Sequence, residues 1–255
     1  MAENKTDKYS FDQFVNFIQN NFSFILIVAV VFTTGFLVGA LWKENQVLKG
    51  KNKVALEEQD AQQPQGPDAE KLGKMPSINE DDYQRGAKDG KITIVEYSDY
   101  ECPFCNKFHP TMLKVMEEYK NDVTWVYRHF PLDALHQDSR NLAEISECVG
   151  KYGGEDKFWE FTDLIYERIV DDTKVVEEEN ALAIVAEIGV SKNKVVTCLE
   201  NEETVEAVKE DEAGGKKAGI SGTPGSIILV KDGDPQLIPG ALPYEAIKKT
   251  IEELL

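Results

Sequence analysis

The chain has 255 residues, enough for one domain of ordinary size plus accessory segments, and its 42% apolar content can supply a hydrophobic core. Its formal net charge of −18 argues against nucleic acid and anionic membrane surfaces as partners, because both select for clustered lysine and arginine. Two acidic groups, Glu177–Glu179 and the set Glu200, Glu202 and Glu203, lack the spacing of an EF-hand loop, so we expect solvated helix faces there.

An uncharged run of 21 residues, Phe22–Trp42, is rich in Phe, Ile, Leu and Val. At a rise of about 1.5 Å per residue it nearly matches a bilayer core of about 30 Å. We expect a transmembrane anchor at 22–42, preceded by a cytoplasmic segment at 1–21. The alternative is a cleaved signal peptide ending at Val38-Gly39-Ala40, but the long apolar run and the weakly basic N-terminus favour a retained anchor.

Residues 43–75 are polar, with Gln62–Pro67 at their centre, and few of them are apolar enough to be buried. This composition predicts a flexible linker. The folded domain is expected at 76–255.

A strand is predicted at Ile92–Ser98, because the segment is rich in β-branched and aromatic residues and shows the pattern of a strand buried on both faces. Cys102-Pro103-Phe104-Cys105 follows, and then a stretch with helical spacing, Asn106–Lys120. Unpaired N–H groups and the positive end of the dipole at a helix start favour thiolate, the reactive form of cysteine. Two thiols placed there can form, break and pass on a disulfide.

Two other uses of this pair are half of a zinc site and an inert surface disulfide. Zinc would need two more ligands nearby, and the sequence has no second Cys-x-x-Cys. His109, one turn beyond Cys105, is a lone candidate ligand. We therefore expect no metal.

The remaining elements follow from spacing. Apolar residues at helical spacing predict a core face on the helix after the cysteine pair: Phe104, Phe108, Met112, Val115, Met116 and Tyr119. Further on, the patterns predict a strand at Val123–His129, helices from about 137 to 217, a hairpin of Ser226–Val230 with Gln236–Pro239, and a helix at Pro243–Leu255. Breaks in the helical region are predicted at Gly153-Gly154, Asp171-Asp172, Gly189 and Gly214-Gly215.

Several motifs occur together in order. Glu96 lies six residues before Cys102, Pro110 lies five after Cys105, and Gly222-Thr223-Pro224-Gly225 precedes a predicted strand. With His129-Phe130-Pro131-Leu132, these motifs resemble the DsbA-like family of thiol:disulfide oxidoreductases over about residues 76–255. The resemblance implies an α/β thioredoxin fold with an inserted helical subdomain, about 137–217.

Roles follow for individual residues. Cys102, at the helix start and within reach of solvent, is the expected nucleophile, and the more buried Cys105 the resolving thiol. By the resemblance, Glu96 is a buried acid that moves protons at Cys105; the alternative is a solvated acid at a wet strand end. The resemblance also makes Thr223-Pro224 a cis-proline loop that pairs with an extended substrate segment.

Three further features complete the expected site. Phe104 departs from the strongly oxidising members of the family, which carry histidine there, and offers a thiolate no charge. His129 and His136 are interpreted as structural. Cys148 and Cys198 are expected to form a structural disulfide, because an even cysteine count outside the cytoplasm favours pairing. Two free buried thiols are the alternative.

We interpret the chain as a thiol:disulfide oxidoreductase held in the cytoplasmic membrane by a single span. Its catalytic domain would lie outside the cytoplasm and donate the Cys102–Cys105 disulfide to exported proteins, without a dissociable organic cofactor. The family implies reoxidation by a quinone-coupled membrane oxidase. The alternatives are a reductase or isomerase of exported proteins and a non-catalytic peptide-binding module, against which the intact cysteine pair argues.

The orientation rests on two opposing arguments. Flanking lysines are Lys5 and Lys8 before the span and Lys43, Lys49, Lys51 and Lys53 after it. The positive-inside rule alone would leave the domain in the cytoplasm. Long domains translocate largely regardless of flanking charge, however, and the family resemblance implies export.

Overall fold

The computed structural model describes residues 16, 19–21, 69–168, 177–231 and 233–255. The chain divides into two compact units, 1–64 and 65–255, and the second holds the fold described below. Among the described residues, no helix has the length and apolar character that a membrane span requires. The predicted anchor at 22–42 lies outside those residues.

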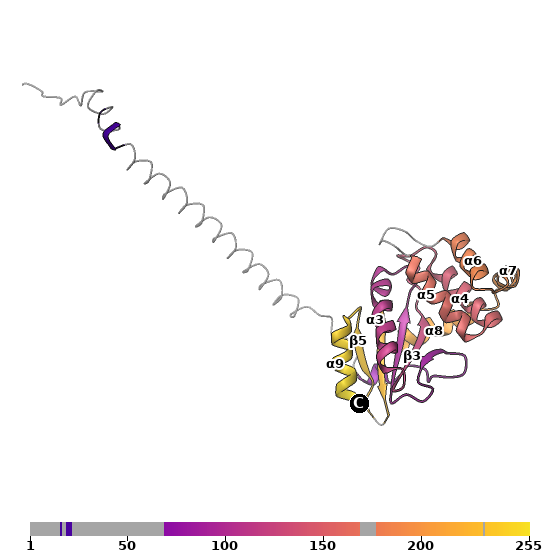
Figure 1. Ribbon diagram of the computed structural model, residues 1–255. Helices are drawn as coiled ribbons and strands as arrows, with labels where there is room; N and C mark the ends of the chain where they lie inside the picture. The colour runs from indigo at the N-terminus through magenta and orange to yellow at the C-terminus, as the bar shows by residue number, and fades with distance from the viewer. Residues whose placement is uncertain (1–15, 17–18, 22–68, 169–176, 232) are drawn as a thin grey trace, which may run out of the picture. The chain divides into compact units, whose positions relative to one another are not determined.

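A five-stranded mixed sheet has the order β1-β3-β2-β4-β5 (Figure 1). The strands are β1 (Tyr83–Gly86), β2 (Ile92–Ser98), β3 (Val123–His129), β4 (Gly225–Val230) and β5 (Gln236–Pro239). The β2–β3 pair is parallel and the other three pairs are antiparallel. The predicted strands are thus confirmed. The sequence pattern gave no sign of β1, a four-residue edge strand that is only partly buried.

The two faces of β2 belong to different halves of the core. Ile92 and Ile94 pack in the larger apolar cluster, with α3 (Pro103–Tyr119) and α9 (Tyr244–Leu254). Val95 and Tyr97 pack in a smaller cluster on the opposite face. Because side chains alternate along a strand, the even-numbered positions Glu96 and Ser98 lie on the face that also carries Ile92 and Ile94.

Residues before the predicted linker boundary at 75 already belong to the described fold. Residues Ala69–Leu72 form the short helix α2, and Leu72 is buried in the smaller apolar cluster. Arg128 of β3 donates hydrogen bonds to the carbonyl oxygens of Pro76 and Ser77, at 3.0 and 3.3 Å. Burial of one leucine and this buried guanidinium therefore tie residues 69–77 to the sheet.

The predicted helical insertion consists of α4 (Ser139–Gly153), α5 (Glu155–Arg168), α6 (Glu178–Glu187), α7 (Lys192–Glu200) and α8 (Val205–Lys217). Figure 1 shows α4 to α7 grouped together, well separated from α9. Gly154 and Gly189 follow α4 and α6 with φ of 85° and 79°, backbone conformations that favour glycine. The break predicted at Asp171-Asp172 lies outside the described residues.

The predicted break at Gly214-Gly215 is wrong, since α8 continues through both glycines to Lys217. A Cβ atom on Gly215 would lie 2.8 Å from the ring of Phe130 and 2.9 Å from the ring of Tyr97. The two glycines therefore serve close packing of α8 against the sheet, which overrides their low helix propensity.

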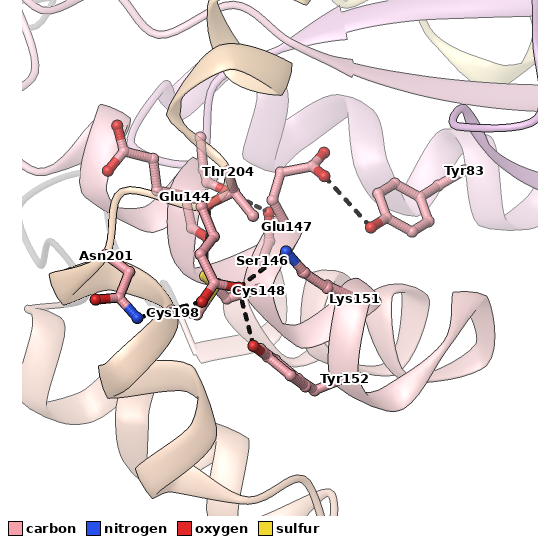
Figure 2. Close-up of a disulfide and its surroundings, with 12 residues drawn as sticks. Tyr83, Glu144, Ser146, Glu147, Cys148, Lys151, Tyr152, Cys198, Asn201 and Thr204 are labelled. Carbon is pink, nitrogen blue, oxygen red and sulfur yellow. Dashed lines mark hydrogen bonds and ion pairs between the residues drawn. A yellow bond between two sulfur atoms is a disulfide. The ribbon is translucent and has the colours of Figure 1, made fainter.

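Cys148 of α4 and Cys198 of α7 form a disulfide, with their Cα atoms 6.1 Å apart (Figure 2). Both residues are fully buried. Thr204 lies beside the bridge, with its hydroxyl 3.4 Å from the sulfur of Cys148. The bridge closes a loop of the chain that contains α5 and α6.

Candidate active site

The cysteine pair lies where β2 passes into α3, at the carboxyl end of a central strand. Cys102 is the N-cap residue of α3, and Cys105 lies in its first turn. Asp99 holds the connecting loop: its side chain accepts a hydrogen bond from the N–H of Glu101 at 2.8 Å, and its carbonyl accepts one from the N–H of Cys102 at 3.1 Å. The loop is thus shaped before a substrate arrives.

Cys102 is electrostatically suited to be a thiolate. Hydrogen bonding from the Cys105 thiol, aided by the Thr223 side chain and by the backbone N–H groups of Cys105 and Phe104, lowers the pKa of Cys102 to about 6, although partial burial opposes this shift. The carbonyl oxygen of Thr223, 3.4 Å from the Cys102 sulfur, favours the protonated thiol instead. The lowered pKa means that the hydrogen-bond donors around the sulfur together outweigh the effect of burial.

Cys105 has the opposite character. It is completely buried, and burial, the hydrogen bond with Cys102 and the charge of Glu96 raise its pKa well above the ordinary thiol value. Cys102 is itself only 4% exposed, so the solvent access expected from sequence is smaller than predicted. The order of the two thiols remains as expected, with the outer one ionised and the inner one protonated.

Glu96 is fully buried beneath the cysteine pair. Its Oε1 accepts a hydrogen bond from Ser98 at 2.7 Å, and its Oε2 accepts one from the indole N–H of Trp125 at 3.0 Å. Burial raises its pKa to about 7, and these two hydrogen bonds limit the shift. The alternative of a solvated acid at a wet strand end therefore does not hold.

Two hydroxyl groups in this network were missed by the sequence analysis. Ser98 lies two residues after Glu96 on the same strand face, so the alternation of β2 could have indicated it. Tyr166 of α5 places its hydroxyl 3.0 Å from that of Ser98. No local sequence signal could have indicated Tyr166, because it comes from the helical insertion 68 residues later.

Phe104 corrects the predicted core face of α3. The other members of that apolar stripe are buried, whereas Phe104 is 59% exposed. It lies between the two cysteines in the first turn, where its backbone supplies an N–H to the Cys102 sulfur and its side chain points away from the core. Lys107 lies near it, with Nζ 5.8 Å from the ring centroid.

The Thr223–Pro224 peptide bond is cis, and its loop lies against Cys102 through the carbonyl contact described above. The loop leads directly into β4, which pairs with β2. The structure therefore brings together all five site residues expected from sequence: Glu96, Cys102, Cys105, Thr223 and Pro224.

The histidines have protein partners. His136 lies 2.8 Å from Asp99 through Nδ1, and His109 lies 2.9 Å from Asp163 through Nε2. His129 is buried next to two carboxylates, and the ligand atoms of His129, Glu147 and Asp211 lie within 4.8 Å of one another. These three groups could hold a metal ion. These residues also contact one another directly, because ring Nε2 of His129 lies 3.2 Å from Oε1 of Glu147, and the backbone N–H of His129 donates to Asp211 at 2.8 Å.

A thioredoxin fold with a thiol pair at the start of a helix, facing a cis-proline loop, is typical of proteins that exchange disulfides. The family model described as Thioredoxin matches residues 78–253. The chain therefore belongs to this thioredoxin family.

Three solved structures are similar in fold. The catalytic domain of Proteus mirabilis ScsC has a TM-score of 0.61 at 20% identity, covering 73% of this chain and 97% of that one. Oxidised BdbD from Bacillus subtilis has a TM-score of 0.61 at 25% identity, covering 71% and 95%. The thiol-disulfide exchange protein α-DsbA2 from Wolbachia pipientis has a TM-score of 0.61 at 16% identity, covering 73% and 95%. The thioredoxin fold of this chain is thus shared with these three proteins.

Curated relatives match over a shorter stretch. A protein named Na(+)/H(+) antiporter NhaA 1 from Salinispora arenicola is 27% identical over 143 residues, which are 56% of this chain and 21% of the relative. Its namesake from Mycolicibacterium gilvum is 39% identical over 83 residues, 32% of this chain and 13% of the relative. The chain spans only a small part of the length of these relatives.

Proposed function

We propose that this protein is a thiol:disulfide oxidoreductase that donates its Cys102–Cys105 disulfide to exported proteins. The observation that carries this proposal is the opposite ionisation of the two thiols, with the pKa of Cys102 lowered to about 6 and that of Cys105 raised well above its ordinary value. A stabilised Cys102 thiolate favours the reduced form, and a dithiol whose reduced form is stabilised is a stronger oxidant.

The chemistry needs only the protein's own sulfurs. A substrate thiolate attacks Cys102 in the oxidised pair, the Cys102–Cys105 bond breaks, and Cys105 leaves with the electron pair. A second substrate thiolate then attacks the mixed disulfide, so that the substrate is oxidised and Cys102 leaves as a thiolate. No dissociable cofactor and no metal take part in these steps.

The Thr223–Pro224 loop is the proposed substrate-binding loop. Its carbonyl lies beside the Cys102 sulfur, so an extended segment pairing with this loop would place its own cysteine near the nucleophile. Phe104, exposed in the first turn of α3, would border the same segment.

The proposed setting is a cytoplasmic membrane, with a single span at 22–42 and the catalytic domain outside, where disulfides persist. The proposed partner for reoxidation is a quinone-coupled membrane oxidase, as the DsbA-like resemblance implies. In intact cells, a membrane-impermeant maleimide applied after mild reduction should label Cys102. Labelling only after lysis would place the domain inside and favour the reductase alternative.

The direct test is equilibration of the purified full chain with glutathione buffers, followed by transfer of its disulfide to a reduced, unfolded protein. The oxidised chain should form disulfides in the substrate, and Cys102→Ser should not. A potential as low as that of thioredoxin, about −270 mV, would indicate a reductase. No exchange with either reagent would indicate a peptide-binding module.

A further inference from the structure

A buried hydroxyl lies between the acid and the inner thiol. Ser98 is on the same face of β2 as Glu96 and is almost completely buried. Its Oγ is 2.7 Å from Oε1 of Glu96, and its hydrogen bonding to Cys105 lowers the pKa of that thiol against the larger, opposite effect of burial. One hydroxyl group thus touches both the reacting sulfur and the buried carboxyl group.

The second partner of the carboxyl group cannot carry a proton onward. Oε2 of Glu96 accepts from the indole N–H of Trp125, a group that donates but does not accept hydrogen bonds. A serine hydroxyl does both, so it can take a proton from one neighbour while giving its own to another. Of the two groups bound to Glu96, only Ser98 can therefore pass a proton.

A second hydroxyl group, from the helical insertion, contacts Ser98. Ser98 has one proton, so it donates to one neighbour at a time, while its oxygen can accept hydrogen bonds from others. The hydroxyl of Tyr166 lies 3.0 Å from Ser98 Oγ and 3.4 Å from the carbonyl oxygen of Asp99, and the hydroxyl of Tyr127 lies 2.9 Å from that of Tyr166. Burial raises the pKa of both tyrosines well above the usual phenol range, so both keep their protons and remain donors.

We propose that Ser98 relays the proton between Cys105 and Glu96 during disulfide exchange, and that Tyr166 is the positioning residue that keeps the Ser98 hydroxyl directed at this pair. The proposal rests on the proposed function and adds a catalytic residue to it. As the Cys102–Cys105 bond breaks, Cys105 receives the electron pair and takes the Ser98 proton, while Ser98 takes the proton of Glu96. In reoxidation the same protons move in reverse, and Cys105 becomes the attacking thiolate.

The test compares two buried serines in the full-length chain. Ser98→Ala removes the proposed relay. Ser226→Ala is the matched control, because Ser226 is buried opposite Glu96 in the β2–β4 register and its hydroxyl has no hydrogen-bond partner in the described part of the chain. The measurement is the single-turnover rate of disulfide transfer to a reduced peptide between about pH 5 and 9, a range that spans the usual titration window of a tuned acid.

We expect Ser98→Ala to slow transfer by about tenfold or more near neutral pH, since a positioned acid or base contributes at least that much. Ser98→Thr should restore much of the rate, and Ser98→Ala added to Glu96→Gln should cause no further loss. Ser226→Ala should behave as the wild type. Tyr166→Phe should also slow disulfide transfer, but by less than Ser98→Ala. If Ser98→Ala does not fold, the rate of Tyr166→Phe serves as the test of the relay.

The relay would be overturned if the wild type is active and Ser98→Ala transfers disulfides at the same rate across the pH range. It would also be overturned if the loss of transfer rate in the double variant equals the product of the losses in Ser98→Ala and Glu96→Gln alone. If the wild type and Ser226→Ala both fail to transfer a disulfide, the proposed function itself fails, and the relay with it.

Discussion

The sulfur of Cys102 lies 3.4 Å from the carbonyl oxygen of Thr223, 121 residues later in the chain. The contact exists because β2, which leads to the cysteine pair, hydrogen-bonds along its length with β4, which follows the Thr223–Pro224 loop. The sheet therefore brings the proposed nucleophile and the proposed peptide-binding loop together at one end of the interior strands β2 and β4, with the helical insertion between them in sequence.

Replacement of each active-site cysteine in turn should have a different effect on the accumulation of mixed disulfides with a substrate. In Cys105→Ser the Cys102 thiolate still attacks, but no resolving thiol releases the substrate, so mixed disulfides accumulate. Cys102→Ser should form almost none, since the remaining thiol is completely buried and has a raised pKa. Non-reducing gels after mixing with an oxidised peptide would show this. Equal trapping by both variants would reverse the assigned roles.

Replacement of the exposed Phe104 should change the pKa of the Cys102 thiol. Phe104→His places a group that can be positively charged beside Cys102, so the pKa of the thiol should fall below about 6 and the domain should become more oxidising. Phe104→Gln controls for the loss of the ring. The pKa of Cys102 in both variants is measured from the thiolate absorbance of the reduced proteins during an acid titration. An unchanged titration in Phe104→His would show that this position does not act on the sulfur.

The stability of the oxidised protein should depend on pH through Glu96. Burial raises its folded pKa to about 7, above an unfolded value of about 4.3. The stability associated with this group is thus fully present below the unfolded pKa and is lost as pH rises through the folded pKa. Relative to Glu96→Gln, the wild type should lose roughly 3 kcal/mol in free energy of unfolding between about pH 4 and 8.

Urea unfolding of both oxidised proteins at several pH values gives this difference directly, because every other titrating group is common to the pair. A difference in unfolding free energy that stays constant with pH would mean that Glu96 keeps an ordinary pKa in the folded state.

The Cys148–Cys198 bridge should be structural. It joins residues 50 positions apart, so its removal in Cys148→Ala/Cys198→Ala should cost roughly 4 kcal/mol in the chain-entropy model. Because both sulfurs are buried, the bridge should also resist reductant longer than the active-site disulfide. Peptide mapping after timed exposure to dithiothreitol measures the order of reduction. Loss of this bridge before the active-site one would contradict the prediction.

Local sequence was sufficient for the elements that carry the cysteines. The strands at 92–98 and 123–129 were predicted with the bounds that the structure has, because a strand buried on both faces is a continuous run of β-branched and aromatic residues. Cys102 and Cys105 could be ordered from sequence because their position at a helix start is itself local.

Two local features were predicted wrongly because they depend on which surfaces of the fold pack against each other. Gly214 and Gly215 resemble a helix break in sequence, but in α8 they allow close contact with Tyr97 and Phe130. Phe104 fits the apolar stripe of α3, yet it is exposed in the first turn, whereas the other members of the stripe are buried. Neither outcome could be derived from spacing, because spacing does not say what packs opposite a residue.

The sequence by itself determined the reacting pair, the strand that leads to it and the acid on that strand, since each is set by neighbours a few residues away. Only the tertiary structure decided the electrostatics of the site. The pKa of about 7 for Glu96 arises from complete burial, and the hydroxyls of Ser98 and Tyr166 meet although 68 residues separate them. Desolvation and long-range hydrogen bonds are properties of packed surfaces, which the order of residues alone does not show.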